Sequence, residues 1–446
     1  MVEQLFRHGP PAPSSALLDP GCGDGPFIDG VIRWCERKGT SMPRIVGIES
    51  DPSHVAVAKE RFARVSQVQI RQADFLGPVR ERFDYAIGNP PYVPITALTL
   101  SERETYRRGY RTAKGRFDLY LLFYEQALGV LKPGGRLVFI TPEKFLYVET
   151  ARPLRDLLRR HSVEKLHFLN EQTFGELVTY PLVTTIAATP PGEATVVVHR
   201  DGQITIARLD ASDGRSWLPT VLGADEEPGD LTLGDICTRV SCGIATGADR
   251  VFVVRNDDLD PELRRFAHPT IAGRQIAPGA PLEPRDQMLI PYAEDGRLLP
   301  EAGLGALGRY LADRDRRAAL LERTCVRRKP WYAFHETPPL ADVRRPKLLC
   351  KDITPAPFFV ADRGGTVVPR HSVYYVVPAD PDCLDELRDY LDSPLAQAWL
   401  RGHCQRAANG FLRVQSHILK RLPLPAGFAP LRKAPDARLQ LEAHLA

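Results

Sequence analysis

The stretch Asn89-Pro90-Pro91-Tyr92 is the part of the chain whose residue types point most directly to chemistry. It directly follows a strand-like apolar run, 83–88, and its two consecutive prolines end that run. Two prolines remove two backbone donors and hold the chain extended and stiff, so a carbonyl group there has no local donor. Taken alone, Asn-Pro-Pro could equally be a turn that ends a strand. The interpretation therefore depends on the residues that precede it.

Three alternating glycines, Gly21, Gly23 and Gly25, lie in the segment DPGCGDGPF, 19–27. Glycine lets the backbone approach a ligand closely, and the loop after a strand is where open α/β sheets bind cofactors. A dinucleotide-binding fingerprint would need its third glycine at Pro26, so the spacing argues against NAD. The alternative is a tight strand-to-helix turn that binds nothing.

Acidic residues end the next two strand-like runs. Glu49 closes RIVGIE, 44–49, and Asp74 follows VQIR, 68–71, directly before Phe75. A carboxylate at the first position can accept both hydroxyls of a ribose, although a helix-capping acid is the alternative. Asp74 could accept an exocyclic amine, with Phe75 as an apolar wall for a purine. Four successive strands would then each end in a polar or glycine element at one edge of a sheet.

The elements that must position these residues alternate as in a parallel sheet covered by helices. Strand-like runs occur at 16–19, 44–49, 68–71, 83–88, 136–141, 164–169 and 183–189. Helix-like runs lie between them at 27–37, 54–64, 120–131 and 151–160. Only a loop separates the last two strands, which predicts an antiparallel hairpin at one sheet edge. The fold class of the first half is therefore α/β.

The composition is typical of a soluble globular protein. The chain has 446 residues, 43% hydrophobic and 26% charged, which predicts two or three domains. No apolar run is long enough to cross a bilayer, and MVEQLFRHGP lacks the apolar core of a signal peptide, so we expect a cytoplasmic protein. The eight cysteines are scattered without zinc-ligand spacing, so we expect reduced thiols and no metal site.

Positive charge is concentrated in two segments. The whole chain has a formal net charge of only +4, but 309–347 contains eleven basic and five acidic residues. Without a resemblance, that segment could be a solvated helical face, but its basic residues precede Trp331, Tyr332 and Phe334, which favours phosphate binding. A second basic segment, 106–116, is expected to be a loop. The candidate nucleic-acid contacts are Arg107, Arg108, Arg111, Lys114, Arg327, Arg328 and Lys329.

Taken in order, LLDPGCGDGPF, VGIESDP, RQADF and FDYAIGNPPYV resemble the TaqI-like, gamma-class S-adenosylmethionine-dependent DNA adenine-N6 methyltransferases. The resemblance continues closely through 114–146 and 173–183. It implies a Rossmann-like methyltransferase sheet with a terminal antiparallel hairpin over 1–225, with S-adenosyl-L-methionine as cofactor. It also implies a mixed α+β target-recognition domain that binds DNA over 226–446. That second half resembles its counterpart more loosely.

The resemblance also implies roles for individual residues. It implies cofactor contacts from Asp19, Pro20, Gly21, Gly23, Glu49, Ser50, Asp74, Phe75 and Pro91. The implied catalytic residues are Asn89, Pro90, Pro91, Tyr92 and Phe174. Phe174 stands where the family has a second aromatic that stacks on the target base, although Tyr180 is a rival, and a core aromatic is the alternative for Phe174.

The chemistry that this resemblance implies for Asn-Pro-Pro-Tyr then follows from the low nucleophilicity of the target amine. An adenine amino group is a poor nucleophile because its lone pair is delocalised into the ring. Hydrogen bonds from the amine to the Asn89 side-chain oxygen and the Pro90 carbonyl would stabilise the positive charge that grows during attack. The base must first be flipped out of the duplex, and stacking on Tyr92 and Phe174 would offset part of the unstacking cost.

Three alternatives remain open. The same motif serves glutamine methylation in protein release factors and amine methylation in ribosomal RNA, although those enzymes usually lack so long a carboxyl-terminal extension. The third is a catalytically weakened DNA-binding module, because the family usually begins with a Thr-Pro element and MVEQLF resembles only the helix that follows it. The expected partner is double-stranded DNA, with a separate restriction endonuclease as a further candidate. We expect a monomer without membrane association, and no motif encodes the target sequence.

Overall fold

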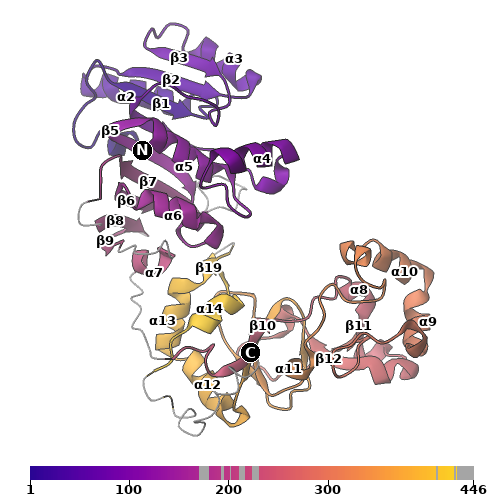
Figure 1. Ribbon diagram of the computed structural model, residues 1–446. Helices are drawn as coiled ribbons and strands as arrows, with labels where there is room; N and C mark the ends of the chain where they lie inside the picture. Colours follow the sequence, from indigo (N-terminus) through magenta and orange to yellow (C-terminus); the bar gives the residue numbers. More distant parts are fainter. Residues whose placement is uncertain are drawn as a thin grey trace, which may run out of the picture. The chain divides into compact units, whose positions relative to one another are not determined.

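A computed structural model describes residues 1–169, 180–191, 195–200, 202–209, 216–222, 231–407, 410–425 and 428 of the chain. The chain divides into two compact units, Met1–Asp225 and Glu226–Ala446, each of which is described by itself (Figure 1). In the described ranges, no helix is both long enough and apolar enough to cross a membrane.

The first unit is built on a nine-stranded sheet with the order β3-β2-β1-β4-β5-β7-β6-β8-β9. Its strands are β1 (Ala16–Pro20), β2 (Arg44–Glu49), β3 (Val68–Gln72), β4 (Phe83–Gly88), β5 (Leu131–Pro142), β6 (Ser162–Phe168), β7 (Pro181–Ala187), β8 (Thr195–Arg200) and β9 (Gln203–Arg208). The first five strands are parallel, whereas β7 is antiparallel to both β5 and β6. The strand order reverses beside β1, between β2 and β4.

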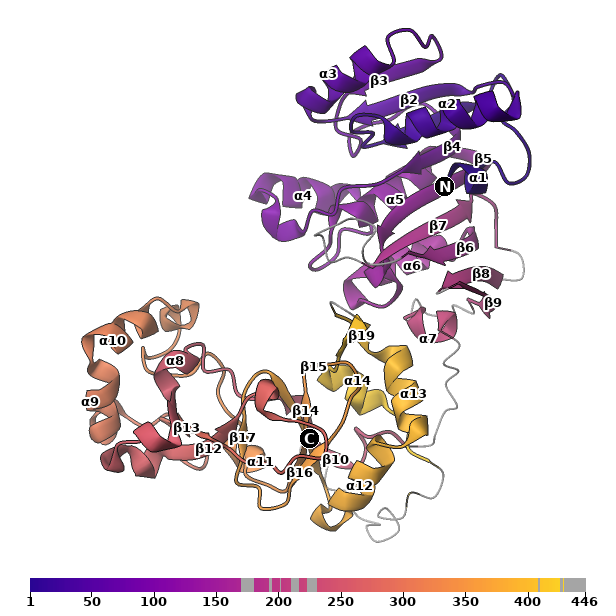
Figure 2. The same cartoon turned by 180° about the vertical axis from the view of Figure 1, so that it is seen from behind.

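Helices cover both faces of this sheet, as a parallel sheet requires (Figures 1 and 2). The helices of this unit are α1 (Val2–Leu5), α2 (Pro26–Lys38), α3 (Pro52–Arg61), α4 (Leu100–Gly109), α5 (Leu119–Val130), α6 (Arg152–Leu158) and α7 (Leu218–Val221), of which α4 buries none of its residues. One buried cluster packs α1 and α2 against the sheet, for example through Leu5 and Trp34. A second cluster packs α5 and α6 through residues such as Tyr124 and Leu154.

The α/β fold class and the expected strands and helices of the first half are confirmed. The expected hairpin is formed by β6 and β7, but it does not lie at the sheet edge, because β8 pairs with β6 and β9 pairs with β8. The short strands β8 and β9 lie in a segment rich in Pro and Gly, where the strand pattern in the sequence is weak.

The helix α4 corrects the expectation of a basic loop over 106–116. Arg107 and Arg108 lie in the last turn of this helix rather than in a loop. Thr99 and Glu102 form a capping box at its start, in which each side chain bonds the backbone amide of the other. None of its residues is buried, so it lacks the apolar stripe by which a sequence reveals a helix.

The second unit has a mixed α+β architecture. One sheet has the order β10-β18-β14-β16, a second β11-β13-β12-β17 and a third β15-β20-β19. The strands are β10 (Cys237–Cys242), β11 (Val253–Arg255), β12 (Ala267–Ile271), β13 (Asp286–Leu289), β14 (Lys347–Lys351), β15 (Ile353–Thr354), β16 (Val360–Asp362), β17 (Val368–Pro369), β18 (Val373–Pro378), β19 (Gln405–Arg406) and β20 (Leu412–Arg413). The helices are α8 (Asp249–Phe252), α9 (Ala306–Ala312), α10 (Arg314–Leu321), α11 (Leu340–Val343), α12 (Leu384–Leu391), α13 (Pro394–His403) and α14 (Ser416–Arg421).

Candidate active site

The candidate site lies at the carboxyl edge of β1 to β4, where the strand order reverses. Parallel pairing places Asp19 of β1 beside Gly47 of β2, and Glu49 of β2 beside Gln72 of β3. The residues that follow these strands therefore emerge at one edge of the sheet. This is the position at which open α/β sheets bind their ligands.

The glycine loop after β1 reaches the Asn-Pro-Pro-Tyr segment after β4. A Cβ atom on Gly21, which has a φ of +71°, would lie 3.7 Å from the Phe123 ring and 3.9 Å from Pro91 Cδ. A Cβ atom on Gly25, with a φ of +83°, would lie only 2.3 Å from the Phe62 ring, so only glycine fits there. The candidate cofactor loop and the candidate catalytic motif thus form a single site.

Asp19 is a buried carboxyl group without a hydrogen-bond partner among the described residues. Its side chain is 0% exposed, and neither carboxyl oxygen has a partner there. Burial and, second, the charge of Glu49 raise the pKa of Asp19 well above its usual value. A buried polar group without a partner is costly, so this carboxyl group suits a ligand that brings a donor, such as an ammonium group.

The Glu49 carboxylate is held in place by the backbone. One oxygen accepts a hydrogen bond from the Gly23 amide at 2.9 Å. The other accepts from the amides of Ser50 and Asp51 at 2.8 and 2.9 Å. Because each carboxylate oxygen can accept more than one bond, Glu49 keeps capacity for ligand hydroxyls in a fixed orientation.

Asp74 and Phe75 lie after β3, as expected from the sequence. One oxygen of Asp74 accepts from the Leu76 amide at 2.9 Å, and the other lies 3.4 Å from the Tyr106 hydroxyl. The Phe75 ring is 2% exposed and contacts the Phe123 ring with centroids 5.2 Å apart. Phe75 is therefore a wall of the core beside the site.

Sequence reasoning missed Phe123 and Tyr106. Phe123 lies in α5, where it reads as one apolar residue of a buried helix. Tyr106 lies in α4, which the sequence pattern does not reveal. No local signal distinguishes either side chain, because both reach the site only through tertiary packing.

Asn89 presents a hydrogen-bond acceptor to the site. Its side-chain oxygen is buried and has no hydrogen-bond partner in the described parts of the chain. The segment after it is fixed, because Leu119 donates to the Val93 carbonyl at 2.9 Å and Ile95 donates to the Phe117 carbonyl at 3.0 Å. The acceptor is thus preorganised for a ligand that brings an N–H donor.

Tyr92 is half-buried beside this acceptor. Its hydroxyl donates to the Ile140 carbonyl at 3.2 Å, and its ring meets Tyr120 edge-on at 6.2 Å. Burial and, second, Tyr124 raise the pKa of Tyr92, so the hydroxyl keeps its proton. These contacts fix the position of the ring.

The second aromatic remains a prediction. Phe174 lies outside the described residues. Its rival Tyr180 is half-buried and directly precedes β7, and its carbonyl accepts from the Glu143 amide at 2.8 Å. Because Pro181 pairs with Pro142 at the end of β5, Tyr180 lies at the same sheet edge as Asn89.

The basic segment of the second unit needs a correction. Tyr332 and Phe334 belong to a hydrophobic core, so they do not form a surface with the neighbouring basic residues. Trp331 donates its indole N–H to Glu301 at 3.2 Å. Among the basic residues, Arg327 and Arg328 are exposed. Lys347 forms a buried ion pair with Asp362 at 2.5 Å, and Arg344 pairs with Glu294 at 2.7 Å. Lys329 donates to the His335 carbonyl at 3.0 Å.

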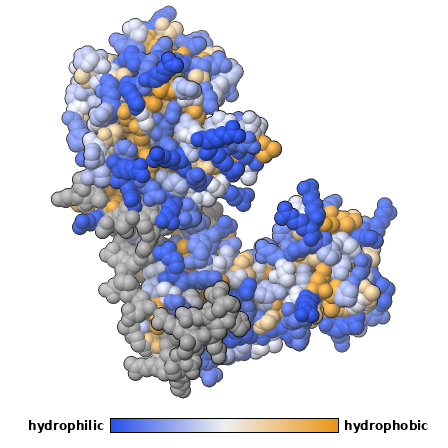
Figure 3. Space-filling view, viewed as in Figure 1, coloured by the Kyte–Doolittle hydropathy of each residue, from blue (hydrophilic) through white to orange (hydrophobic). Residues whose placement is uncertain are grey.

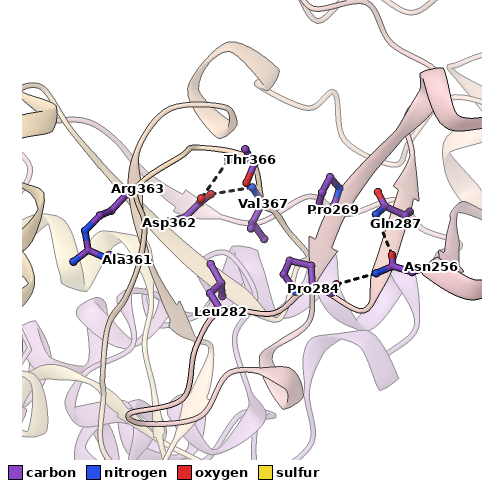
Figure 4. Close-up of a pocket in the computed structure, with 10 residues that line it drawn as sticks. All are labelled: Asn256, Pro269, Leu282, Pro284, Gln287, Ala361, Asp362, Arg363, Thr366 and Val367. Carbon is purple, nitrogen blue, oxygen red and sulfur yellow. Dashed lines mark hydrogen bonds between the residues drawn. The ribbon is translucent and has the colours of Figure 1, made fainter.

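A pocket of about 440 Å³ in the second unit is not a comparable site (Figure 4). Its Asp362 carboxylate accepts from the amides of Thr366 and Val367 at 3.2 and 2.9 Å. Its Asn256 side chain donates to the Pro284 carbonyl and accepts from Gln287. These polar groups are satisfied by one another rather than directed at a ligand.

Comparisons with known proteins place these features in a family. Residues 44–174 match the model of the Eco57I restriction-modification methylase family. The chain is 30% identical to type II methyltransferase M.PaeR7I of Pseudomonas aeruginosa in a gapped alignment 482 residues long. The alignment covers 94% of this chain and 82% of that protein. It is 27% identical to type II methyltransferase M.XhoI of Xanthomonas vasicola, over 83% of this chain and 74% of that protein.

A solved structure shows the same fold across both halves. The type IIL restriction-modification enzyme MmeI, in complex with DNA, superposes with a TM-score of 0.68 at 14% identity. The superposition covers 96% of this chain and 65% of that one. The similarity therefore extends well beyond the sheet that carries the candidate site.

Proposed function

Because this chain belongs to the type II methyltransferases of restriction-modification systems, and S-adenosyl-L-methionine is its cofactor, we propose that it methylates the N6 amino group of adenine in double-stranded DNA. The observation that carries this proposal is the buried Asn89 side-chain oxygen, which has no partner in the described residues. An exocyclic amine brings the N–H donor that such an acceptor needs.

The residues around the glycine loop fit the cofactor. The carboxyl group of Asp19 would receive the ammonium group of its methionine part, because that buried group has no other partner among the described residues. Glu49 would accept the ribose hydroxyls, with Ser50 and Gly23 orienting its carboxylate. The cofactor supplies an electrophilic methyl group on a sulfonium centre.

The base of the cofactor would lie against the loop after β3. Asp74 would accept its 6-amino group, and Phe75 would form part of an apolar wall. Gly21 has no side chain at this point, so the cofactor could approach its backbone closely beside Pro91. Pro20 is the last residue of β1 and directly precedes the glycine loop.

The protein's part in methyl transfer is to hold the target amine. Asn89 and the Pro90 carbonyl accept its two N–H groups, which stabilises the positive charge that develops on nitrogen. Attack precedes proton loss, so no base is needed before attack, and the methylated nitrogen then loses its proton to solvent. The stiff proline pair keeps the acceptors in place while Tyr92, with Phe174 as second aromatic, stacks on the flipped base.

The second unit would recognise the target sequence, and basic residues of both units would contact phosphate. In the first unit these are Arg107, Arg108, Arg111 and Lys114, and in the second Arg327, Arg328 and Lys329. We propose a monomer in the cytoplasm, where it reaches double-stranded DNA, with a separate restriction endonuclease as partner of the same system.

The alternatives are less well supported. Glutamine or ribosomal RNA methylation needs no unit of this size after the catalytic sheet, whereas the relative M.PaeR7I aligns with 94% of the chain. A weakened DNA-binding module would not need the preorganised acceptor at Asn89.

The test is to express the chain in a host without endogenous DNA methylation and to sequence the modified bases by single-molecule methods. We expect 6-methyladenine at one short sequence, and none when Asn89→Ala is expressed at the same level. Unmodified DNA, or 4-methylcytosine instead, would contradict the adenine assignment.

A further inference from the structure

Tyr106 joins α4 to the loop that follows β3. Its hydroxyl lies 3.4 Å from an oxygen of Asp74, and its ring packs against the core of the first unit. Burial, followed by the charge of Asp74, raises the pKa of Tyr106 to about 12. The hydroxyl therefore keeps its proton and donates to the carboxylate.

The same loop is held at two further points. Tyr110 donates to the Leu76 carbonyl at 2.7 Å, and Gln126 of α5 donates to the Gly77 carbonyl at 2.9 Å. The loop 74–77 is thus attached to the segment that follows the Asn-Pro-Pro-Tyr motif. An interaction that restricts the motion of α4 would therefore also restrict the motion of the loop 74–77.

The two oxygens of Asp74 are not equivalent. One accepts from the Leu76 amide within the loop, and the other faces Tyr106. Each oxygen thus has one donor and keeps a further lone pair, so the oxygen that faces Tyr106 can also accept from a ligand amine. A donor that fixes this oxygen also fixes the direction in which it accepts from a ligand.

We propose that Tyr106 is a positioning residue, which holds the Asp74 carboxylate for the 6-amino group of the cofactor's adenine and makes α4 the link between cofactor and DNA. This inference rests on the proposed function, because it takes Asp74 as the acceptor of that amine.

The link to DNA follows from the residues next to Tyr106 in the helix. Arg107 and Arg108 are exposed, and the surface over α4 is predominantly hydrophilic (Figure 3). Arg107 donates to the Gly115 carbonyl at 3.4 Å, and Arg108 lies 3.6 Å from Glu104. Both are weak surface contacts that phosphate could replace. Phosphate bound there would restrict the motion of α4 and so of Tyr106 beside Asp74. Binding of DNA would then strengthen binding of the cofactor, and by thermodynamic reciprocity the cofactor would strengthen binding of DNA.

The first experiment compares two ligands by calorimetry on the full chain. One is S-adenosylhomocysteine, and the other is the same molecule with hydrogen in place of the 6-amino group. Tyr106→Phe keeps the ring and removes only the hydroxyl, so we expect about 3- to 10-fold weaker binding of the first ligand, as for loss of one hydrogen bond. Binding of the second ligand should not change, since it offers no amine to Asp74.

Thr105→Ala is the matched control. Thr105 is exposed in the same helix, and its hydroxyl donates to the Ser101 carbonyl at 3.0 Å, within the helix itself. This control should bind both ligands as wild type does. Equal weakening of both ligands by Tyr106→Phe, or no weakening of either, would overturn the inference. Failure of wild type to bind S-adenosylhomocysteine would instead contradict the proposed cofactor site.

The second experiment measures S-adenosylhomocysteine affinity with and without a DNA duplex at fixed ionic strength. We expect DNA to tighten binding in wild type and in Thr105→Ala, and to tighten it less in Tyr106→Phe. An equal effect of DNA in all three proteins would overturn the coupling through α4. Melting temperatures of the ligand-free proteins show whether Tyr106→Phe remains as well folded as wild type.

Discussion

The backbone amide of Gly23 donates a hydrogen bond to the Glu49 carboxylate at 2.9 Å, which joins the loop after β1 to the end of β2. The other carboxylate oxygen is held by the amides of Ser50 and Asp51. Because the protein backbone already orients this carboxylate, a ligand need not order it on binding, and preorganisation of this kind strengthens binding.

Removing that carboxylate should weaken cofactor binding. Glu49→Ala should cost about 1–3 kcal/mol, because ribose hydroxyls would lose their acceptor and the Gly23 amide would lose its partner. Titration calorimetry with S-adenosylhomocysteine measures the change. Glu60→Ala, at an exposed position in α3, is the control and should bind normally. Unchanged affinity in Glu49→Ala would place the ribose elsewhere.

Asp19→Asn should raise the stability of the protein and weaken its binding of the cofactor. The pKa of Asp19 is raised in the folded protein by burial, so the folded state binds more protons than the unfolded state above the usual carboxyl pKa. The contribution of Asp19 to the free energy of unfolding therefore falls as pH rises, whereas an uncharged Asn side chain has no such pH dependence. We expect Asp19→Asn to melt at a higher temperature than wild type near neutral pH, with the difference shrinking in acid.

The same substitution should weaken binding of S-adenosylhomocysteine, because a neutral amide offers its ammonium group a weaker hydrogen bond than a carboxylate does. Thermal melts across pH, with and without that ligand, measure both effects. A variant that melts lower than wild type at neutral pH, or that binds the ligand equally well, would show that Asp19 has another role.

Neutralising three adjacent basic residues of the second unit should weaken DNA binding at every sequence. Replacement of Arg327, Arg328 and Lys329 by glutamine should lower the slope of log affinity against log salt by up to about 3, since roughly 0.9 counterion is released per phosphate contact. Arg344→Gln is the control, because Arg344 pairs with Glu294. Fluorescence anisotropy over a salt series gives the slope, and an unchanged slope would make this segment an ordinary solvated surface.

Tyr92 should act through its ring rather than its hydroxyl. Tyr92→Phe removes the bond to the Ile140 carbonyl but keeps the stacking surface, so most activity should remain. Tyr92→Ala should lower both base flipping and turnover, since stacking contributes about 1–3 kcal/mol per base. Fluorescence of 2-aminopurine at the target position reports flipping. Equal loss in both variants would assign the role to the hydroxyl.

The strands and the residues at their ends could be predicted because local patterns encode them. A buried parallel strand is a short apolar run, and a residue that ends it, such as Glu49, or closely follows it, such as Asp74, must lie at the sheet edge. The order of the strands then brings those residues together. The pairing of β6 with β7 could be predicted for a similar reason, since the two strands are neighbours in the chain and the sequence between them has no helical pattern.

The rest depends on contacts that no local pattern encodes. The helix α4 buries none of its residues, so only its capping box at Thr99 and Glu102 could have revealed it. Tyr332 and Phe334 are buried despite their basic neighbours, because the side chains of adjacent residues can point to opposite sides of the chain. The approach of Tyr106 to Asp74 joins residues 32 positions apart and is visible only in the folded chain.

The most direct test of the proposed chemistry is methyl transfer by Asn89→Ala. The substitution removes an acceptor that matters most as positive charge develops on the target nitrogen, so transfer should fall by about a hundredfold or more, while DNA and S-adenosylhomocysteine still bind. The measurement follows tritium from labelled S-adenosyl-L-methionine into DNA and identifies the product base after digestion. The account predicts 6-methyladenine from wild type and almost none from Asn89→Ala. Full activity in Asn89→Ala, or label found only in 4-methylcytosine, protein or RNA, would contradict it.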